Sequence, residues 1–144
     1  MRAAPGRIIV DSGPIIALFD AGDAYHHAAI EFVRQSRAKL ISSMAMVTEA
    51  MYVLDQSLQA RKNLLAWIQG GGLTLTEPVN GDFARIGELI EKYADLPMDF
   101  TDAVVVALCE RLSINHVASV DGDFGIYRYK GRTKFINMFH EAAP

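Results

Sequence analysis

The chain has 144 residues, 51% of them hydrophobic, which is enough for one domain with a substantial core. Its 14 basic and 17 acidic residues give a net charge of −3, so the overall basic character typical of nucleic-acid-binding proteins is lacking. The single cysteine, Cys109, excludes an internal disulfide and a cysteine-based zinc site. No signal sequence and no apolar run of roughly 18 residues is present, so we expect a soluble, cytoplasmic protein without a membrane partner.

Short β-branched runs alternate with helical patterns along the whole chain. After a loose N-terminal extension over 1–6, the predicted strands cover Arg7–Val10, Lys39–Ser42, 73–76, 116–120 and 133–137. The predicted helices cover 14–19, 24–36, 47–58, a segment that ends at the glycines 70–72, 81–93 and 100–112.

Strands that alternate with helices indicate a parallel sheet with helices on both faces. We therefore predict one α/β domain over 1–144, a doubly wound three-layer α/β/α fold with a central, mainly parallel sheet. Such sheets carry their functional sites beyond the carboxyl ends of the strands.

Acidic residues lie at two of these strand ends and on one helix. Asp11 follows the first strand, and Asp121 follows the strand predicted at 116–120. Each also has an ordinary explanation, because Asp11 suits a turn or a helix cap and Asp121 begins an Asp-Gly turn pair. Glu49 is the only charged residue in the helical stretch 44–54, where a solvent-facing position would also account for it.

The stretch LPMDFTDAVVVALC, residues 96–109, places Asp99 and Asp102 against a strongly apolar run. Asp99 is positioned to cap the helix, and Asp102 lies in its first turn, where the helix dipole stabilises a carboxylate. Because this helix is apolar on all sides, we expect it to be buried, so that Asp102 needs a partner at the edge of the core. The next basic residue is Arg111 at the far end of the helix, which leaves a distant base, a hydrogen-bond network or a metal.

Three of these acids are predicted to converge. If the strands before Asp11 and Asp121 lie in one parallel sheet, both side chains emerge at the same edge, and the helix that carries Asp102 begins at that edge too. Clustered carboxylates without suitable Cys or His ligands favour Mg²⁺ or Mn²⁺. A divalent ion held in this way can activate water against a phosphodiester, so the residues indicate phosphodiester hydrolysis.

These motifs resemble those of the PIN-domain ribonucleases and, among them, the VapC-like toxins of type II toxin–antitoxin pairs. IIVDSGPIIALFD is similar to the family's opening strand with its first acid, and TEAMYVL to the helix with its glutamate. LPMDFTDAVVVALCERL is similar to the third acidic motif and ASVDGDF to the last. The resemblance therefore extends over nearly the whole chain.

The resemblance also implies roles for individual residues. The catalytic acids would be Asp11, Glu49, Asp102 and Asp121, with Asp11, Asp102 and Asp121 as metal ligands. Supporting roles fall to Ser12, Asp99, Ser119 and Asp123, and the resemblance leaves open whether Asp121 or Asp123 lies nearer the metal. It further implies Mg²⁺ or Mn²⁺ as cofactor, an RNA substrate, a homodimer and a neutralising antitoxin protein.

One short segment is rich in basic residues. Its cations, Arg128, Lys130, Arg132 and Lys134, alternate with the aromatic residues Tyr127, Tyr129 and Phe135. An edge strand with solubilising charges would show the same pattern. Alternatively, Arg128, Lys130 and Arg132 bind RNA phosphates while the aromatic rings stack on bases.

Two other functions fit parts of the pattern. A non-catalytic α/β module could bind RNA or a protein partner with the same surface, its acids serving only as helix caps. A phosphoacceptor domain of the receiver type would also be doubly wound with an acid cluster. It would be expected to carry paired acids after the first strand and a Lys after the last core strand, and the sequence supplies neither.

Overall fold

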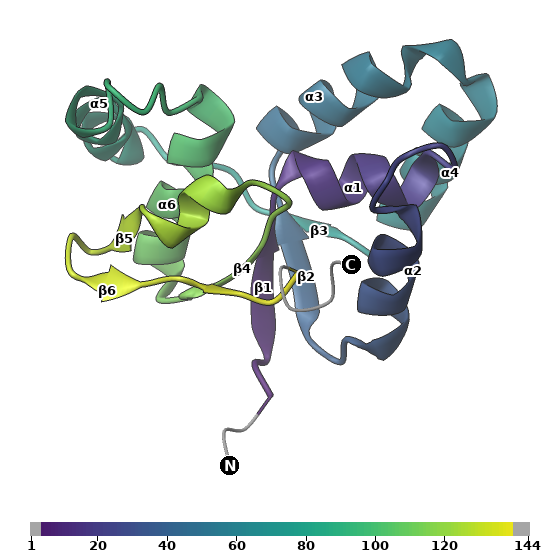
Figure 1. Ribbon diagram of the computed structural model, residues 1–144, viewed down its shortest axis with the longest axis horizontal. Coiled ribbons are helices and arrows are strands. Elements are labelled where there is room, and N and C mark those ends of the chain that lie inside the picture. The colour runs from purple at the N-terminus through teal and green to yellow at the C-terminus, as the bar shows by residue number, and fades with distance from the viewer. Residues whose placement is uncertain (1–3, 140–144) are drawn as a thin grey trace.

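A five-stranded parallel sheet forms the centre of the computed structural model, which describes residues 4–139 (Figure 1). In spatial order β3-β2-β1-β4-β7, the strands are Thr74–Leu75, Lys39–Ser42, Arg7–Val10, His116–Ala118 and Ile136–Asn137. All four pairs of neighbours run parallel. The predicted parallel sheet is therefore confirmed.

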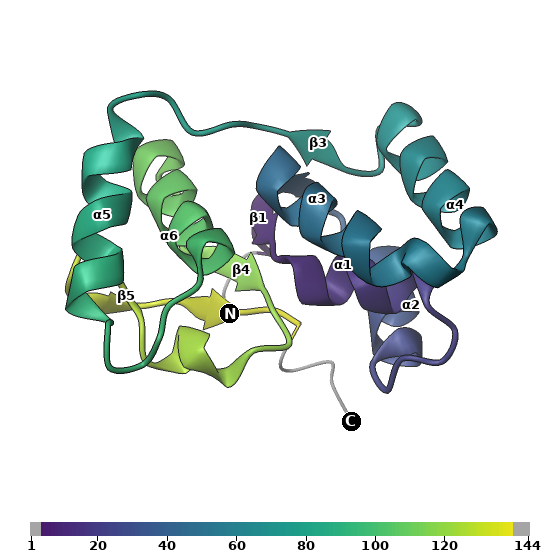
Figure 2. The ribbon, with the colours of Figure 1, turned by 90° about the horizontal axis from the view of Figure 1, so that it is seen from above.

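Helices cover both faces of this sheet. They are α1 (Ser12–Phe19), α2 (His26–Gln35), α3 (Met44–Val53), α4 (Leu58–Gln69), α5 (Asp82–Lys92) and α6 (Phe100–Leu112). Seen from two directions, α1 to α4 lie on one side of the sheet, and α5 and α6 lie on the other (Figures 1 and 2). This arrangement confirms the predicted three-layer α/β/α fold.

The buried helix predicted at 100–112 is α6. Every residue from Ala103 to Cys109 is at most 3% exposed, because α6 packs against β1, α5 and the C-terminal hairpin. Ser113 ends the helix in the left-handed conformation, with φ 57°. Since α6 precedes β4, its first turn lies at the carboxyl edge of the sheet, as the sequence predicts.

The helix predicted over 47–58 is in fact two helices. α3 ends at Val53, a 3₁₀ turn covers Leu54–Gln56, and α4 starts a new direction. Ser57 causes the break, because its side-chain oxygen accepts a hydrogen bond from the Ala60 N–H at 3.0 Å and caps α4. The apolar spacing continues across this turn, so the periodicity alone did not reveal it.

The single edge strand predicted at 133–137 is also divided. Thr133–Lys134 forms β6, which pairs antiparallel with β5 (Arg128–Tyr129), whereas Ile136–Asn137 joins the main sheet as β7. The hairpin turn has positive φ at Lys130 and Gly131, 50° and 75°. Hairpin turns of this kind favour Asn or Asp before Gly. Because Lys130 takes that position here, the sequence pattern does not indicate the turn.

The predicted loose extension over 1–6 ends at the first hydrogen bond between the neighbouring segments. The Gly6 carbonyl accepts a hydrogen bond from the Lys39 N–H at 2.9 Å, which continues the pairing of β1 with β2. Residues 1–3 of the extension lie outside the described residues. Within 4–139, no helix has the length and apolar character needed to cross a membrane.

Candidate active site

The acidic residues gather where two neighbouring strands end. β1 and β4 lie side by side, and the chain continues from them to Asp11 on one side and to Ser119 and Asp121 on the other. From β1 the chain adds β2 and β3 on one side, and it then adds β4 and β7 on the other side. The position between β1 and β4 is therefore the topological switch point, where open parallel sheets place their functional sites. The first turn of α6 brings Asp102 to the same edge.

Asp11 is a buried carboxylate, only 6% exposed, and it caps α1. Its Oδ1 accepts a hydrogen bond from the Ser12 N–H at 2.8 Å, and its Oδ2 accepts one from the Ser119 hydroxyl at 3.1 Å. Burial raises the pKa of Asp11 to about 6 against the effect of these bonds, and the charges of Glu49 and Asp121 raise it further. Asp11 is thus a helix cap, as one interpretation of the sequence predicts. Its burial also makes ionisation of its carboxyl unfavourable, which a helix cap does not require.

Asp102 is equally buried, 6% exposed, and its partner is a tyrosine. The hydroxyl of Tyr127 donates to Asp102 Oδ2 at 3.1 Å. Burial, and then the charge of Asp11, raise the pKa of Asp102 to about 7, although the hydrogen bond acts in the opposite direction. Of the partners left open by the sequence, the structure shows a hydrogen bond from a distant residue, and no Lys or Arg of residues 4–139 forms an ion pair with Asp102.

Tyr127 itself is fully buried. Its ring packs edge-on against Tyr93 and Phe124, with centroids 4.9 Å and 5.1 Å away. The hypothesis that this ring stacks on an RNA base is therefore wrong, because the hydrophobic core already covers it. Burial, followed by the charge of Asp102, also raises the pKa of the Tyr127 hydroxyl, which keeps it protonated as a donor.

Glu49 is half-buried and faces the cluster rather than the solvent. The Ser12 hydroxyl donates to Glu49 Oε1 at 2.6 Å, and the Thr101 hydroxyl donates to Oε2 at 3.4 Å. The solvent-facing interpretation is thus wrong. Thr101, which the sequence analysis did not select, connects α3 to the first turn of α6.

Ser119, Asp121 and Asp123 form a hydrogen-bonded turn after β4. The fully buried Ser119 hydroxyl accepts from the Asp121 N–H at 3.0 Å, and Asp121 Oδ1 accepts from the Asp123 N–H at 2.9 Å. The charge of Asp121 raises the pKa of both Asp11 and Asp102. The pKa of Asp123 is raised by desolvation and by its neighbour Asp121.

Asn137 on β7 supports the same turn, although no sequence motif points to it. Its side chain donates to the Ser119 carbonyl at 3.0 Å and accepts from the Ser119 N–H at 3.2 Å. These two bonds fix the backbone from which the Ser119 hydroxyl reaches Asp11.

Asp99 occupies the N-cap position of α6 without making the predicted capping bond. Its backbone is extended, with φ −71° and ψ 158°, and its side chain forms no hydrogen bond to the first turn. The exposed carboxylate instead contributes to the raised pKa of Asp102 and of Asp123. Asp99 is therefore an outer member of the acidic cluster.

Comparisons with known proteins agree with this fold and with this arrangement of acids. The family model described as PIN domain matches residues 8–130. The chain belongs to the PIN domain family. It is also 25% identical over 116 residues to ribonuclease VapC26 of Mycobacterium tuberculosis, an alignment that covers 79% of this chain and 86% of that protein. The resemblance to VapC-like PIN ribonucleases is confirmed.

A solved structure supports the same fold. The crystal structure of VapC20 from Mycobacterium tuberculosis, titled a sarcin-ricin loop cleaving toxin, superimposes with a TM-score of 0.75. The match covers 83% of this chain and 93% of VapC20, at 21% sequence identity. At this identity, the likeness shows a shared PIN fold.

The donor atoms of this PIN domain fit a hard divalent cation in their chemistry. They are carboxylate and hydroxyl oxygens, and within 4–139 no Lys or Arg forms an ion pair with Asp11, Asp102 or Asp121. No three Asp, Glu, His or Cys side chains of the described residues are arranged so that they could hold one metal ion together. Mg²⁺ commonly takes only one or two protein carboxylates and completes its shell with water and substrate phosphate, so the buried pair Asp11 and Asp102 is sufficient.

The predicted RNA-binding cations of the PIN domain are carried by the β5–β6 hairpin, which follows directly after Tyr127. Arg128 donates from its guanidinium to the carbonyls of Gly125, Ile126 and Tyr127 at 2.9, 2.9 and 3.1 Å. It therefore stabilises the preceding turn. Lys130 and Arg132 are exposed at the tip of the hairpin.

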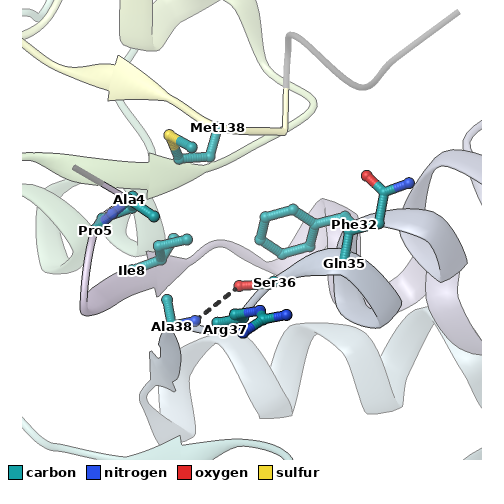
Figure 3. A pocket seen from close by; sticks show the side chains of 9 residues that line it. All are labelled: Ala4, Pro5, Ile8, Phe32, Gln35, Ser36, Arg37, Ala38 and Met138. Carbon is teal, nitrogen blue, oxygen red and sulfur yellow. Dashed lines mark hydrogen bonds between the residues drawn. The ribbon is translucent and has the colours of Figure 1, made fainter. Parts of the chain in front are cut away.

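A separate pocket of about 380 Å³ lies between β1, the end of α2 and the α2–β2 connection (Figure 3). Its lining is largely apolar and includes Phe32 and Met138, with Arg37 as its charged member. None of the predicted site residues lines it. The pocket therefore does not belong to the acidic cluster.

Proposed function

We propose that this PIN domain is a metal-dependent endoribonuclease that hydrolyses RNA phosphodiester bonds. The observation that carries the proposal is the pair of buried carboxyls, Asp11 and Asp102, at the switch point of the sheet. Burial and then the charges of neighbouring acids raise both pKa values, so ionising the pair costs stability, and no Lys or Arg of residues 4–139 forms an ion pair with either acid. The similarity to ribonuclease VapC26 supports RNA as the substrate.

The catalytic acids in this proposal are Asp11, Glu49, Asp102 and Asp121, and Mg²⁺ or Mn²⁺ is the cofactor. The ion is held by the buried pair Asp11 and Asp102, and Asp121, predicted as a third ligand, adds negative charge beside them. When bound, such an ion lowers the pKa of water and neutralises charge on the phosphate.

The remaining residues orient the acids. The hydroxyl of Ser119 directs Asp11 Oδ2, and that of Tyr127 directs Asp102 Oδ2. The hydroxyl of Ser12 donates to Glu49 and orients this carboxylate at the edge of the cluster. Asp99 is exposed and Asp123 is half-buried, and both add negative charge to the cluster.

The proposal includes a biological role as the toxin of a toxin–antitoxin pair, acting in the cytoplasm as a homodimer that a cognate antitoxin protein neutralises. VapC20, which shares the fold, carries the word toxin in its title. Exposed apolar side chains on α3 and α4, including Tyr52 at 83% and Leu58 at 67%, offer a surface for such protein partners.

The decisive test is cleavage of a mixed RNA pool by the purified protein, with Mg²⁺, with Mn²⁺ or with EDTA. Asp102→Asn is nearly isosteric and keeps an oxygen that can accept from Tyr127, so we expect it to fold and to lose the metal-dependent cleavage. Asp95→Asn removes an exposed acid outside the cluster and serves as the control. Full activity of Asp102→Asn would contradict the assignment, and no cleavage by the folded wild-type protein with either metal would favour a binding module.

A further inference from the structure

The β5–β6 hairpin presents three exposed cations, Lys130, Arg132 and Lys134. None of them forms an ion pair with a carboxylate anywhere in residues 4–139. We infer that this hairpin is a docking surface for the phosphate backbone of the single-stranded RNA that enters the acidic site, an inference that rests on the proposed function. It differs from the sequence-based hypothesis, because Arg128 is excluded and Lys134 is included.

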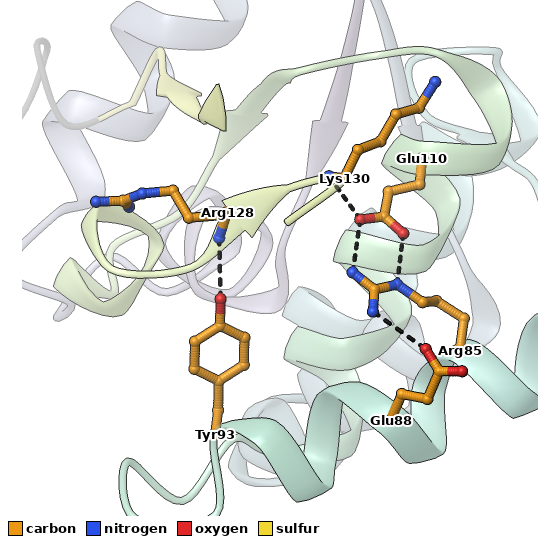
Figure 4. A network of polar contacts seen from close by, with 6 residues as sticks. All are labelled: Arg85, Glu88, Tyr93, Glu110, Arg128 and Lys130. Carbon is orange, nitrogen blue, oxygen red and sulfur yellow. Dashed lines mark hydrogen bonds and ion pairs between the residues drawn. The ribbon is translucent and has the colours of Figure 1, made fainter. Parts of the chain in front are cut away.

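The hairpin is fixed in position by a polar network on α5 and α6 (Figure 4). The Lys130 N–H donates to Glu110 Oε2 at 2.7 Å, and Arg85 donates to both oxygens of the same carboxylate at 2.8 and 3.1 Å. At the other end, the Arg128 N–H donates to the Tyr93 hydroxyl at 3.2 Å. A surface that is already ordered loses less conformational entropy on binding than a mobile loop would.

The hairpin extends away from the acids along α6. Tyr127, just before β5, contacts Asp102 in the first turn of α6, whereas the tip at Lys130 contacts Glu110, eight positions further along. Eight helical residues correspond to about 12 Å. The cations therefore contact phosphates a few nucleotides away from the bond that is cleaved at the acids.

Electrostatics explain why such a surface is needed. The protein has a net charge of −3, and the site itself is lined with carboxylates that repel a polyanion. A local group of cations beside the site raises the concentration of RNA there. The cations of the hairpin thus compensate locally for the charge of the acids that they adjoin.

The aromatic residues of this segment do not read bases. Tyr127 and Phe135 are buried, and Tyr129 is half-buried, with the Lys130 ammonium 5.3 Å from its ring and Phe135 on its edge. The contacts with RNA are therefore ionic contacts with phosphates, which depend on salt and not on sequence.

The test compares two triple variants with the same change in charge. The first combines Lys130→Gln, Arg132→Gln and Lys134→Gln. The control combines Arg37→Gln, Lys39→Gln and Lys62→Gln. These three cations are exposed and lie away from the hairpin, on the α2–β2 connection, on β2 and on α4, respectively. All six side chains are exposed, so both variants should keep the thermal stability of the wild-type protein.

Binding of a fluorescent single-stranded RNA is measured by anisotropy in EDTA, from 50 to 200 mM salt. With ~0.7 counterion released for each phosphate contact, loss of three contacts makes the slope of log affinity against log salt shallower by about 2. We expect at least a tenfold loss of affinity at 50 mM salt for the hairpin variant only. Wild-type affinity and slope in that variant, or an equal loss in the control, would overturn the inference.

This experiment separates the inference from the proposed function, because binding in EDTA requires no cleavage. Hairpin-dependent binding by a protein that never cuts RNA would support the docking surface and refute the nuclease. Metal-dependent cutting with unchanged binding by the hairpin variant would support the nuclease and refute the docking surface.

Discussion

Replacing Asp102 by Asn is expected to stabilise the metal-free protein at neutral and alkaline pH. The folded structure holds this carboxyl in a buried position beside Asp11, so its pKa is about 7, compared with 3.8 for an ordinary Asp. Between about pH 4 and pH 7, the unfolded chain therefore releases the Asp102 proton before the folded protein does. The stability of the wild-type protein falls over this range and then levels off above pH 7.

The size of the effect follows from the displacement of the pKa. Each tenfold change in an ionisation constant corresponds to ~1.4 kcal/mol. If the whole difference between the folded and unfolded pKa values acted on stability, it would lower the free energy of unfolding by ~4 kcal/mol. Relaxation of the site and access of water at its edge reduce this value, and we expect about 2 kcal/mol. The Asn side chain lacks the charge and still offers an oxygen to the Tyr127 hydroxyl.

Urea unfolding in EDTA at intervals between pH 4 and pH 9 measures the effect. The free energies of unfolding of wild type and Asp102→Asn should coincide near pH 4, diverge through pH 6 and differ by about 2 kcal/mol above pH 7.5. The control is Asp95→Asn, which should follow the wild type at every pH because Asp95 is exposed. A variant that is no more stable than wild type at pH 8, or equally stabilised at pH 4, would refute the reasoning.

Three further predictions concern the same site and the fold around it. Tyr127→Phe removes the donor to Asp102, so Mn²⁺ affinity measured by calorimetry should fall about tenfold with the fold intact; an unchanged affinity would show that the hydroxyl does not orient the carboxylate. Mg²⁺ at 100 times its dissociation constant should raise the free energy of unfolding of the wild-type protein by about 2.7 kcal/mol. An equal increase in the double variant Asp11→Asn with Asp102→Asn would mean that the ion binds at another site. Gly72→Ala should cost about 1 to 3 kcal/mol in urea unfolding, because the added methyl group would collide with the Trp67 indole; no loss would mean that the ring moves away freely.

The parts of the account that the sequence could predict depend on regular spacing. The alternation of β-branched runs with amphipathic stretches predicts the parallel sheet, and the geometry of such a sheet then predicts that Asp11 and Asp121 emerge at one edge. The apolar surroundings of Asp102 predict a buried carboxylate near its helix terminus. These inferences succeed because each follows from the period of one element or from the general geometry of parallel strands.

The parts that the sequence could not predict depend on contacts between distant residues. The hydrogen bond from Tyr127 to Asp102 joins residues 25 positions apart, and the bond from Ser12 to Glu49 joins residues 37 positions apart. The strands β5 and β6 have two residues each, too short to show an alternating pattern. The sequence pattern therefore groups Tyr127 with the basic segment around it, although the core buries this residue.

The central claim is that the acidic cluster hydrolyses RNA with the help of a divalent ion, and the chemistry of the product ends tests it most directly. End-labelled RNA is incubated with wild type or Asp102→Asn in Mg²⁺ and in EDTA, and the new termini are identified by mass spectrometry. The account predicts products with a free phosphate and a free hydroxyl, formed only by the wild type and only with the metal. Products that end in a 2′,3′-cyclic phosphate, formed equally well in EDTA, would contradict it, because the 2′-hydroxyl of the RNA would then be the nucleophile.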